Sequence, residues 1–255
     1  MNRLLPRLLP WLAPAVLLLI WQTGASIGWI DSQTLPPPTA VFRALLNLAR
    51  TGELWNDIVV SSARAGAGFI AGGSIGFILG MLNGLSGLSE KLTDTTLQML
   101  RNIPHLALIP LVILWFGIGE EAKLFLVALG VFFPIYVNTL HGVRSVDPQL
   151  LEMAGAYGMS RRDIFWKVVF PGALPSIFVG LRYGLGIMWL TLIVAETISA
   201  SSGIGFMAMN AREFLMVDVV VVSILIYAAL GKLADSIARW LERTCLRWNP
   251  VYSEA

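Results

Sequence analysis

Long runs without a charged residue constrain the fold of this chain more than any other feature. Four such runs are each close to the length of about 20 residues that a helix needs to cross a bilayer: residues 8–30, 65–89, 102–119 and 124–143. Two further apolar runs, 176–195 and 217–237, hold only a few charges. We therefore predict an all-α integral membrane protein with six transmembrane helices.

The composition also indicates a membrane protein. Hydrophobic residues make up 56% of the 255 residues, charged residues only 13%, and the mean hydropathy is +0.72. A soluble domain is about a quarter charged, so we expect most of this chain to lie in lipid. The net charge of +2 gives no indication of nucleic-acid binding. The first run exceeds the roughly 7 to 15 apolar residues of a signal-peptide core, so we expect it to stay as an anchor.

The positions of the basic residues predict the orientation of the chain. With the N-terminus inside, thirteen of the eighteen Lys and Arg residues fall on one side of the membrane, and the other side holds only Arg43, Arg50, Arg64, Lys123 and Arg212. Loops rich in basic residues are retained on the cytoplasmic side. We therefore expect both termini in the cytoplasm, together with the polar segment between the fourth and fifth runs.

That polar segment, residues 147–176, has turn chemistry that predicts two short helices joined at a glycine. Asp147 can cap the first helix, and Pro148 suits its first position because its N–H would be unpaired there in any case. Gly158 can supply the left-handed residue that ends the helix. A segment with this shape and this many charges is expected to lie in water.

The second short helix has its own start and stop signals. Ser160 can cap it, and Asp163 follows three residues later as in a capping box. Pro171 and Pro175 cannot donate a backbone hydrogen bond, so we expect them to stop this helix before the next span begins.

The same segment resembles the EAA loop of ATP-binding-cassette importer permeases. It reads E-x-A-x-x-Y-G-x-S and ends in V-x-F-P-G-A-L-P, and the matching residues are Glu152, Ala154, Tyr157, Gly158, Ser160 and Pro171. Met153 stands where the family has alanine. In that family the loop is a coupling helix that docks on a cytoplasmic ATPase. The resemblance implies a type I importer permease fold and contact with the ATPase through these residues and the adjacent Arg161 and Arg162.

The resemblance covers nearly the whole chain, from Trp21 to Pro250. Segments such as RNIPHLALIPLVILWFGIGEEAK and AREFLMVDVVVV look like the aliphatic sulfonate permeases of the nitrate, sulfonate and taurine importer family. This implies a multi-pass protein of the bacterial inner membrane that moves aliphatic sulfonates. Taurine, nitrate or another small anion are the alternative substrates.

The family's complexes imply the partners of this chain. These are a dimer of cytoplasmic ABC ATPases, a second permease copy and an extracytoplasmic sulfonate-binding protein. ATP and Mg are implied on the ATPase, since this chain has no G-x-x-x-x-G-K-[ST] motif and is expected to bind no cofactor and to be no enzyme by itself. An ion-coupled secondary transporter is the alternative from another class, but it would need buried acidic relays or inverted repeats.

Five glycines in the second run recur at every fourth position: Gly68, Gly72, Gly76, Gly80 and Gly84. Small residues at this interval let another helix approach closely, so we predict that this face packs against a neighbouring helix. A phosphate site is the weaker reading, because a dinucleotide fingerprint would follow a strand.

The fifth run and its outer end supply the candidates for a translocation pathway: Arg182, Glu196 and Ser199. An ionisable group within a span usually faces a bundle interior, a partner or water. Structural roles are the alternatives. Arg182 can snorkel to the cytoplasmic surface or tie the span to the polar segment, and Glu196 can hydrogen-bond to residues 199–205.

Two outer segments have distinct patterns. Residues 36–38 are prolines that lead into an amphipathic helix, for which Thr39 is a candidate cap and whose apolar face can lie on the membrane surface. A structural brace is favoured for this segment over a partner-binding role. Residues 199–205 are rich in Ser and Gly, so we expect a break in the helix there, either as a gate or as a plain hairpin.

No metal site is predicted. His105 and His141 lie on different runs, without Cys, Asp or Glu at ligand spacing, and the lone Cys245 permits no intrachain disulfide. We expect three parts along the chain: residues 1–63 with the anchor span, the Pro-rich loop and the amphipathic helix, residues 64–240 as the transmembrane core with the coupling loop 147–172, and residues 241–255 as a cytoplasmic tail.

Overall fold

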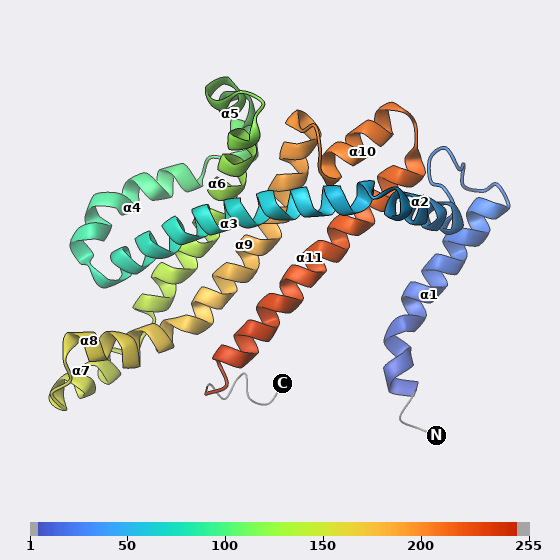
Figure 1. Cartoon of the computed structure of the whole chain (residues 1–255). Coiled ribbons are helices and arrows are strands. Elements are labelled where there is room, and N and C mark those ends of the chain that lie inside the picture. The colour runs from blue at the N-terminus through green and yellow to red at the C-terminus, as the bar shows by residue number, and fades with distance from the viewer. Residues whose placement is uncertain (1–4, 249–255) are drawn as a thin grey trace. The chain divides into compact units, whose positions relative to one another are not determined.

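The computed structural model describes residues 5–248, with side chains from Leu12 onward except that of Ser199. Every regular element in this range is a helix (Figure 1). The helices group into two compact units, one formed by Met1–Val60 and Ser201–Ala228 and the other by Ser61–Ala200 and Ala229–Ala255. The prediction of an all-α protein is confirmed.

The first unit is built from α1 (Leu5–Ser26), α2 (Pro38–Thr51), the start of α3 (Glu53–Leu85), α10 (Ile204–Glu213) and the first part of α11 (Val217–Cys245). Its core joins Val41 and Ala44 of α2 to Val222 of α11, with Trp21 of α1 packed against them. This face of α2 thus packs against protein, which fits a structural brace.

The prediction that Thr39 caps the amphipathic helix is wrong. Helix α2 begins at Pro38, two residues before the start that a Thr39 cap implies, and its N-cap residue is Pro37, which makes no side-chain capping bond. Proline has a fixed φ close to the helical value, so it starts a helix without needing the missing N–H. Thr39 therefore lies inside the first turn.

The expected break near residues 199–205 is confirmed. Helix α9 ends at Ser199 and α10 begins at Ile204, after Gly203 with a φ of 109°. The Gly203 N–H donates to Asp57 Oδ1 at 2.8 Å, so the turn is closed by a side chain from the start of α3.

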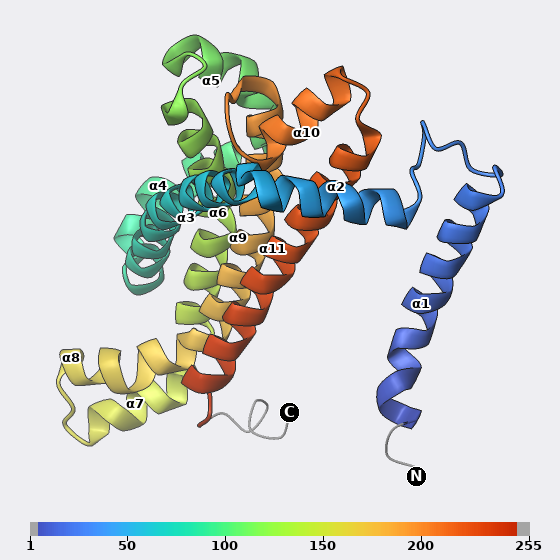
Figure 2. The same ribbon diagram turned by 45° about the vertical axis from the view of Figure 1, so that its right-hand side comes forward.

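The second unit contains most of α3 and the following elements: α4 (Gly87–Arg101), the 3₁₀ turn His105–Leu108, α5 (Ile109–Phe116), α6 (Glu120–Arg144), α7 (Pro148–Ala156), α8 (Arg161–Ile164), the π-helical turn Phe165–Val169 and α9 (Phe170–Ser199). Helices α6 and α9 lie side by side (Figures 1 and 2). Gly142 faces Ala173, while Gly184 faces Ile135, so the two helices run antiparallel.

The apolar helices follow the predicted runs with one exception, but only four or five of the six predicted spans are long and apolar enough to cross a membrane among the described residues. Among the described residues, four helices are long and apolar enough to cross a membrane: Glu53–Leu85, Glu120–Arg144, Arg161–Ile198 and Val217–Cys245. The bent pair Gly87–Arg101 and His105–Phe116 makes a fifth if it is counted as one span, and Leu12–Ser26 is a shorter apolar helix.

The exception is the run 102–119, which is not one straight helix. The chain bends by 81° between α4 and α5. Ile103 precedes Pro104, and the residue before a proline is disfavoured in the helical region, so α4 ends at Arg101 and a 3₁₀ turn follows. The eight residues of α5 are too few to cross a bilayer alone.

Helix α4 is held beside α3 and α6 by polar contacts. Asn83 Nδ2 of α3 donates to Tyr136 Oη of α6 at 2.9 Å and to Thr93 Oγ1 of α4 at 2.7 Å. Arg144 at the end of α6 forms an ion pair with Glu90 of α4. These bonds fix the position from which α4 runs toward the bend.

The five regularly spaced glycines of α3 all face α6. A Cβ on Gly72 would overlap the Ala128 carbonyl, and one on Gly76 would lie 2.5 Å from the Phe132 oxygen. A Cβ on Gly68, Gly80 or Gly84 would lie 2.6 to 2.7 Å from the nearest atom of α6. The contacts advance along both helices in the same direction, so α3 and α6 run parallel with their backbones in contact.

We predict that Gly76→Ala lowers the stability of the protein, because the added methyl group meets a backbone oxygen that cannot move aside. Overpacking of this kind costs about 1–3 kcal/mol, and the melting temperature in detergent measures it. Gly66→Ala is the matched control on the same helix, since nothing lies within 4 Å of its Cβ position. That variant is expected to keep or raise the melting temperature, as alanine favours a helix more than glycine does. Equal melting of both variants would contradict the close packing.

Candidate functional site

The polar segment folds as its turn signals predict in its first half. Asp147 Oδ1 accepts a hydrogen bond from the Gln149 N–H at 2.9 Å, and Pro148 is the first residue of α7. The helix ends at Ala156, and Gly158 has a φ of 72°. The predicted cap and the predicted left-handed glycine are both confirmed.

The turn at Gly158 is closed by two backbone hydrogen bonds of the Schellman type. The Gly158 N–H donates to the Gly155 oxygen at 2.9 Å, and the Met159 N–H donates to the Ala154 oxygen at 3.1 Å. This pattern requires a left-handed residue at Gly158, which glycine adopts without a steric penalty. Ala154 is only 3% exposed, so it packs inside the loop and not on its surface.

The second helix starts at the predicted cap. Ser160 Oγ accepts from the Asp163 N–H at 3.1 Å. In a full capping box the Asp163 carboxylate would accept a hydrogen bond from the Ser160 backbone N–H. Here it accepts from the Ser160 hydroxyl instead, with Oγ at 2.5 Å from Asp163 Oδ2. Asp163 also pairs with Lys167 at 2.8 Å, so its carboxylate is held on both sides.

The prediction that Pro171 and Pro175 stop this helix is wrong. The chain continues from α8 through the π-helical turn Phe165–Val169 into α9, with Pro171 in its first turn and Pro175 inside it. A proline in a regular helix clashes with the carbonyl four residues earlier. The wider π turn changes this spacing just before Pro171, and the Phe170 N–H bonds to the Phe165 oxygen. The loop is therefore continuous with the span, as Figure 2 shows.

Most of the predicted coupling residues point to solvent. Glu152, Gly158 and Ser160 are exposed, and so are the adjacent Arg161 and Arg162, while the Tyr157 side chain is 81% exposed. Within the described range, Glu152 and the two arginines make no ion pair. We call Glu152, Tyr157, Gly158, Ser160, Arg161 and Arg162 the coupling surface. Its charges are available to a partner.

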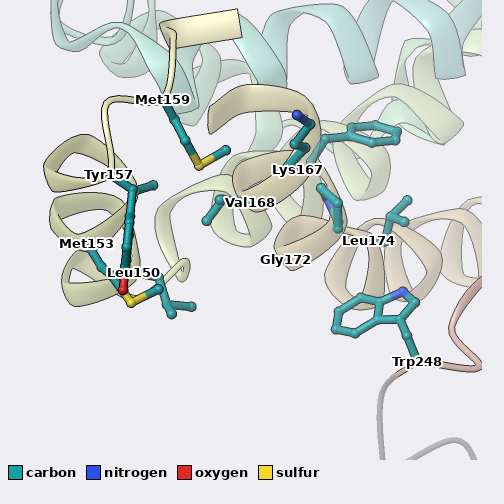
Figure 3. Close-up of a pocket in the computed structure, with 12 residues that line it drawn as sticks. Leu150, Met153, Tyr157, Met159, Lys167, Val168, Gly172, Leu174 and Trp248 are labelled. Carbon is teal, nitrogen blue, oxygen red and sulfur yellow. The ribbon is translucent and has the colours of Figure 1, made fainter. Parts of the chain in front are cut away.

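An apolar groove of about 790 Å³ lies beside the coupling surface. Leu150 and Met153 of α7 and Tyr157 just after it line one side, and Trp248 lies at the other end of the groove (Figure 3). Leu150 and Met153 are about half exposed, at 46% and 51%. Exposed apolar side chains that gather in one place usually mark a site of protein contact.

Two of the pathway candidates are already paired within the fold. Glu196 is 1% exposed and accepts hydrogen bonds from Arg64 Nη1 and from Ser61 Oγ, each at 2.8 Å. Arg64 also pairs with Glu120, which in turn binds Lys123 at 2.8 Å. Two acids and two bases thus balance one another where the start of α6 and the end of α9 meet Arg64 of α3.

Arg182 of α9 lies close to two acids of α11. Its Nε is 3.4 Å from Asp235 Oδ1, and its Nη1 is 3.4 Å from Glu242 Oε2. Asp235 also forms an ion pair with Arg239. These ion pairs join α9 to α11, and the two carboxylates neutralise the charge of Arg182 within the fold.

The remaining candidates are simpler. Ser199 is the last residue of α9, and its side chain lies outside the part of the chain that the structure describes. Across residues 5–248, no three His, Cys, Asp or Glu side chains come together in a way that could hold a metal ion. His105 instead shares a hydrogen bond of 3.0 Å with Thr191.

Sequence patterns do not predict the Arg64 network. Arg64 and Glu196 are 132 residues apart, and only folding brings them together. The sole local signal is the spacing of Glu120 and Lys123, which places an acid and a base three residues apart on one helix.

The sequence of the chain is similar to a known protein family and to named transport proteins. Residues 72–246 match the family model described as "Binding-protein-dependent transport system inner membrane component". The chain is 59% identical, over 96% of its length and 94% of the relative, to the "Putative aliphatic sulfonates transport permease protein SsuC" of Escherichia coli (strain K12). It is 38% identical, over 92% of its length and 87% of the relative, to the "Taurine transport system permease protein TauC" of the same strain.

The fold has a counterpart among solved structures. A chain of the inward-facing MetNI methionine ABC transporter superposes with a TM-score of 0.52, covering 74% of this chain and 94% of that chain at 18% identity. The likeness at this identity concerns the fold alone, and it matches the prediction of a type I importer permease fold.

We predict that Glu196→Gln destabilises the protein and leaves its choice of anion unchanged. The substitution removes a buried charge that faces Arg64, and breaking a buried pair typically costs about 3–5 kcal/mol. Thermal melting in detergent measures the loss, and uptake of different anions by the surviving protein measures selectivity. Glu121→Gln is the control, because Glu121 is the exposed neighbour of Glu120. A Glu196→Gln protein with normal melting and altered selectivity would instead place Glu196 in the pathway.

Proposed function

Because the chain belongs to the family of binding-protein-dependent transport system inner membrane components, we propose that it is the permease subunit of an ATP-driven importer of aliphatic sulfonates. The observation that supports this most directly is the coupling loop. It presents an acid and two arginines that form no ion pair with any described residue, and an exposed tyrosine, next to an apolar groove. A surface of this kind suits a partner protein that the chain must move with.

The partner at this surface is a dimer of cytoplasmic ABC ATPases. The chain itself is no enzyme and binds no cofactor, so ATP and Mg belong to that partner. The continuous helix from α8 through the π turn into α9 supports the coupling. A push on the loop reaches the span without passing through a flexible joint, because the loop and the span share one helix.

Aliphatic sulfonates are the substrate that the 59% identical relative supports. The taurine permease is less similar, at 38% identity, and taurine is itself an aminoalkanesulfonate. Taurine is therefore the second candidate, ahead of nitrate or another small anion. An extracytoplasmic sulfonate-binding protein delivers the anion and sets most of the selectivity.

The chain lies in the bacterial inner membrane with both termini in the cytoplasm. The distribution of basic residues supports this orientation, since it places the coupling loop on the side where ATP is available. A second copy of the permease completes the pore. ATP binding and hydrolysis then switch the pair between outward-facing and inward-facing states.

The substrate assignment is tested with the permease assembled with its ATPase and its binding protein. ATP hydrolysis in proteoliposomes is measured with alkanesulfonates, taurine and nitrate in turn. We expect short alkanesulfonates to stimulate hydrolysis most strongly. Stimulation by taurine alone would identify taurine as the substrate. An assembled complex whose ATP hydrolysis responds to none of these anions would contradict the sulfonate assignment.

The coupling role predicts the effect of Gly158→Val. Valine is strongly disfavoured at a φ of 72°, so the turn must open and displace Tyr157 and Ser160. We expect the protein to insert normally, with a large loss of sulfonate-stimulated ATP hydrolysis and of uptake. Glu152→Lys, which reverses a charge of the coupling surface, is expected to act in the same direction.

Gly155→Val is the matched control for Gly158→Val. Gly155 lies in helix α7 with nothing within 4 Å of its Cβ position, so valine fits there. Its uptake is expected to stay close to that of the unchanged protein. Normal transport by the Gly158→Val complex would refute the role of this turn.

A further inference from the structure

A cavity of about 390 Å³ lies where the bend between α4 and α5 meets α6 and α9. Its polar lining residues are Arg101 and His105 from the bend, Asn138 from α6 and Tyr183 from α9. Pockets that bind small molecules usually measure about 300–1,000 Å³, so the cavity has room for a small organic ligand.

The cavity lies near the middle of two spans. Pro134 is in its lining and close to the centre of α6, which runs from Glu120 to Arg144. Tyr183 is close to the centre of α9, which runs from Phe170 to Ser199. Bent or broken backbone at this depth is tolerated where it is buried in protein or lines a water-filled space. The bend after Arg101 meets that condition because it opens onto the cavity.

Arg101 is the cation of this cavity, and its charge is not matched. It is exposed, and among the described residues no carboxylate lies within 4 Å of it. Arg64 and Arg182, the arginines of α3 and α9, each face two acids. An unmatched arginine at the wall of a cavity within the membrane calls for an anion.

The neighbouring polar groups are held in place for such a ligand. His105 is oriented by its hydrogen bond to Thr191, and Gly130 makes room for it, since a Cβ there would lie 3.3 Å from the imidazole. Asn138 Nδ2 donates one hydrogen bond to the Pro134 oxygen at 2.8 Å and has a second N–H to offer. A guanidinium and further donors together suit a head group with several oxygens.

The rest of the lining is apolar and includes Ile103, Phe133, Val137 and Ile187. An apolar wall beside polar donors fits an anion that carries a short hydrocarbon tail. It does not favour a bare inorganic ion, because such an ion would gain nothing from these side chains.

We propose that this cavity is a transit site for small organosulfonates inside the permease. Arg101 binds the sulfonate oxygens, His105 and Asn138 offer further hydrogen bonds, and the alkyl group lies against Phe133 and Ile187. The site rests on the proposed function, since it takes the anion that the binding protein delivers. Neither Arg182 nor Glu196 takes part, because both are paired within the fold.

The test uses the whole complex of permease, ATPase and binding protein in proteoliposomes, with ³⁵S-labelled ethanesulfonate as the probe. Removing a hydrogen bond to a charged group weakens binding about ten- to hundredfold, so we expect Arg101→Gln to lower the maximal rate of uptake by a factor in this range. Arg101→Lys keeps the charge and is expected to keep part of the rate. The concentration that gives half-maximal uptake should change little, since the binding protein sets it.

Lys91→Gln is the matched control, because Lys91 is an exposed base on the same helix and lies outside the cavity. It is expected to transport normally. Copurification of the ATPase shows whether each variant assembles. An assembled Arg101→Gln complex with an unchanged uptake rate would overturn the transit site.

A second measurement reports occupancy of the cavity without relying on the rate. Cys245 is the single cysteine of the chain, so Cys245→Ser gives a permease without thiols, and Val137→Cys then places one thiol in the cavity wall. The label is an anionic sulfonatoethyl methanethiosulfonate. We expect ethanesulfonate to slow this labelling during ATP turnover but not the labelling of Leu88→Cys, on the exposed face of α4. Equal rates with and without ethanesulfonate would overturn the site.

Failure of the site and failure of the proposed function have different signatures. If the unchanged complex imports ethanesulfonate and Arg101→Gln does so equally well, the function stands and the site falls. If the unchanged complex imports a different anion and none of the sulfonates, the sulfonate assignment falls, and with it the organosulfonate site.

Discussion

The contacts on both sides of α6 are the interaction on which the second unit depends. Helices in lipid satisfy their backbone groups internally and gain little from the hydrophobic effect, so close packing decides how they associate. Glycines of α3 bring its backbone onto α6 from one side. Gly142 and Gly180 bring α6 and α9 together on the other. This fixed core holds the coupling loop at one end and the bend after Arg101 near the middle.

Charge distribution separates structural groups from functional ones. Arg64 and Arg182 each face two acids, and those pairs join helices within the fold. Arg101, Arg161 and Arg162 have no such acids among the described residues. Arg161 and Arg162 lie at the proposed docking surface for the ATPase, and Arg101 lies at the cavity proposed for the anion. Structural and transport roles are thereby assigned to different residues.

Local sequence signals predicted local structure well. Most of the apolar runs, the cap at Asp147 and the left-handed Gly158 depend on neighbouring residues, and the structure has them as predicted. The wrong predictions concern prolines, whose effect depends on the backbone around them. Pro38 starts α2 in place of a Thr39 cap, Pro104 breaks the run 102–119, and Pro171 is accommodated by a π turn. The Arg64 network and the Arg101 cavity join residues far apart in the chain, so no local pattern could reveal them.

The most direct test of the account is a photo-crosslink from the coupling surface. A benzophenone amino acid at Tyr157, whose side chain is 81% exposed, is activated in cells that produce the permease, the ATPase and the binding protein. The account predicts a covalent product with the ATPase, and none when the same group replaces the 86% exposed Trp29, which the predicted topology places at the outer side of the first span. No product at Tyr157 in an assembled complex, or the same ATPase product from Trp29, would contradict it.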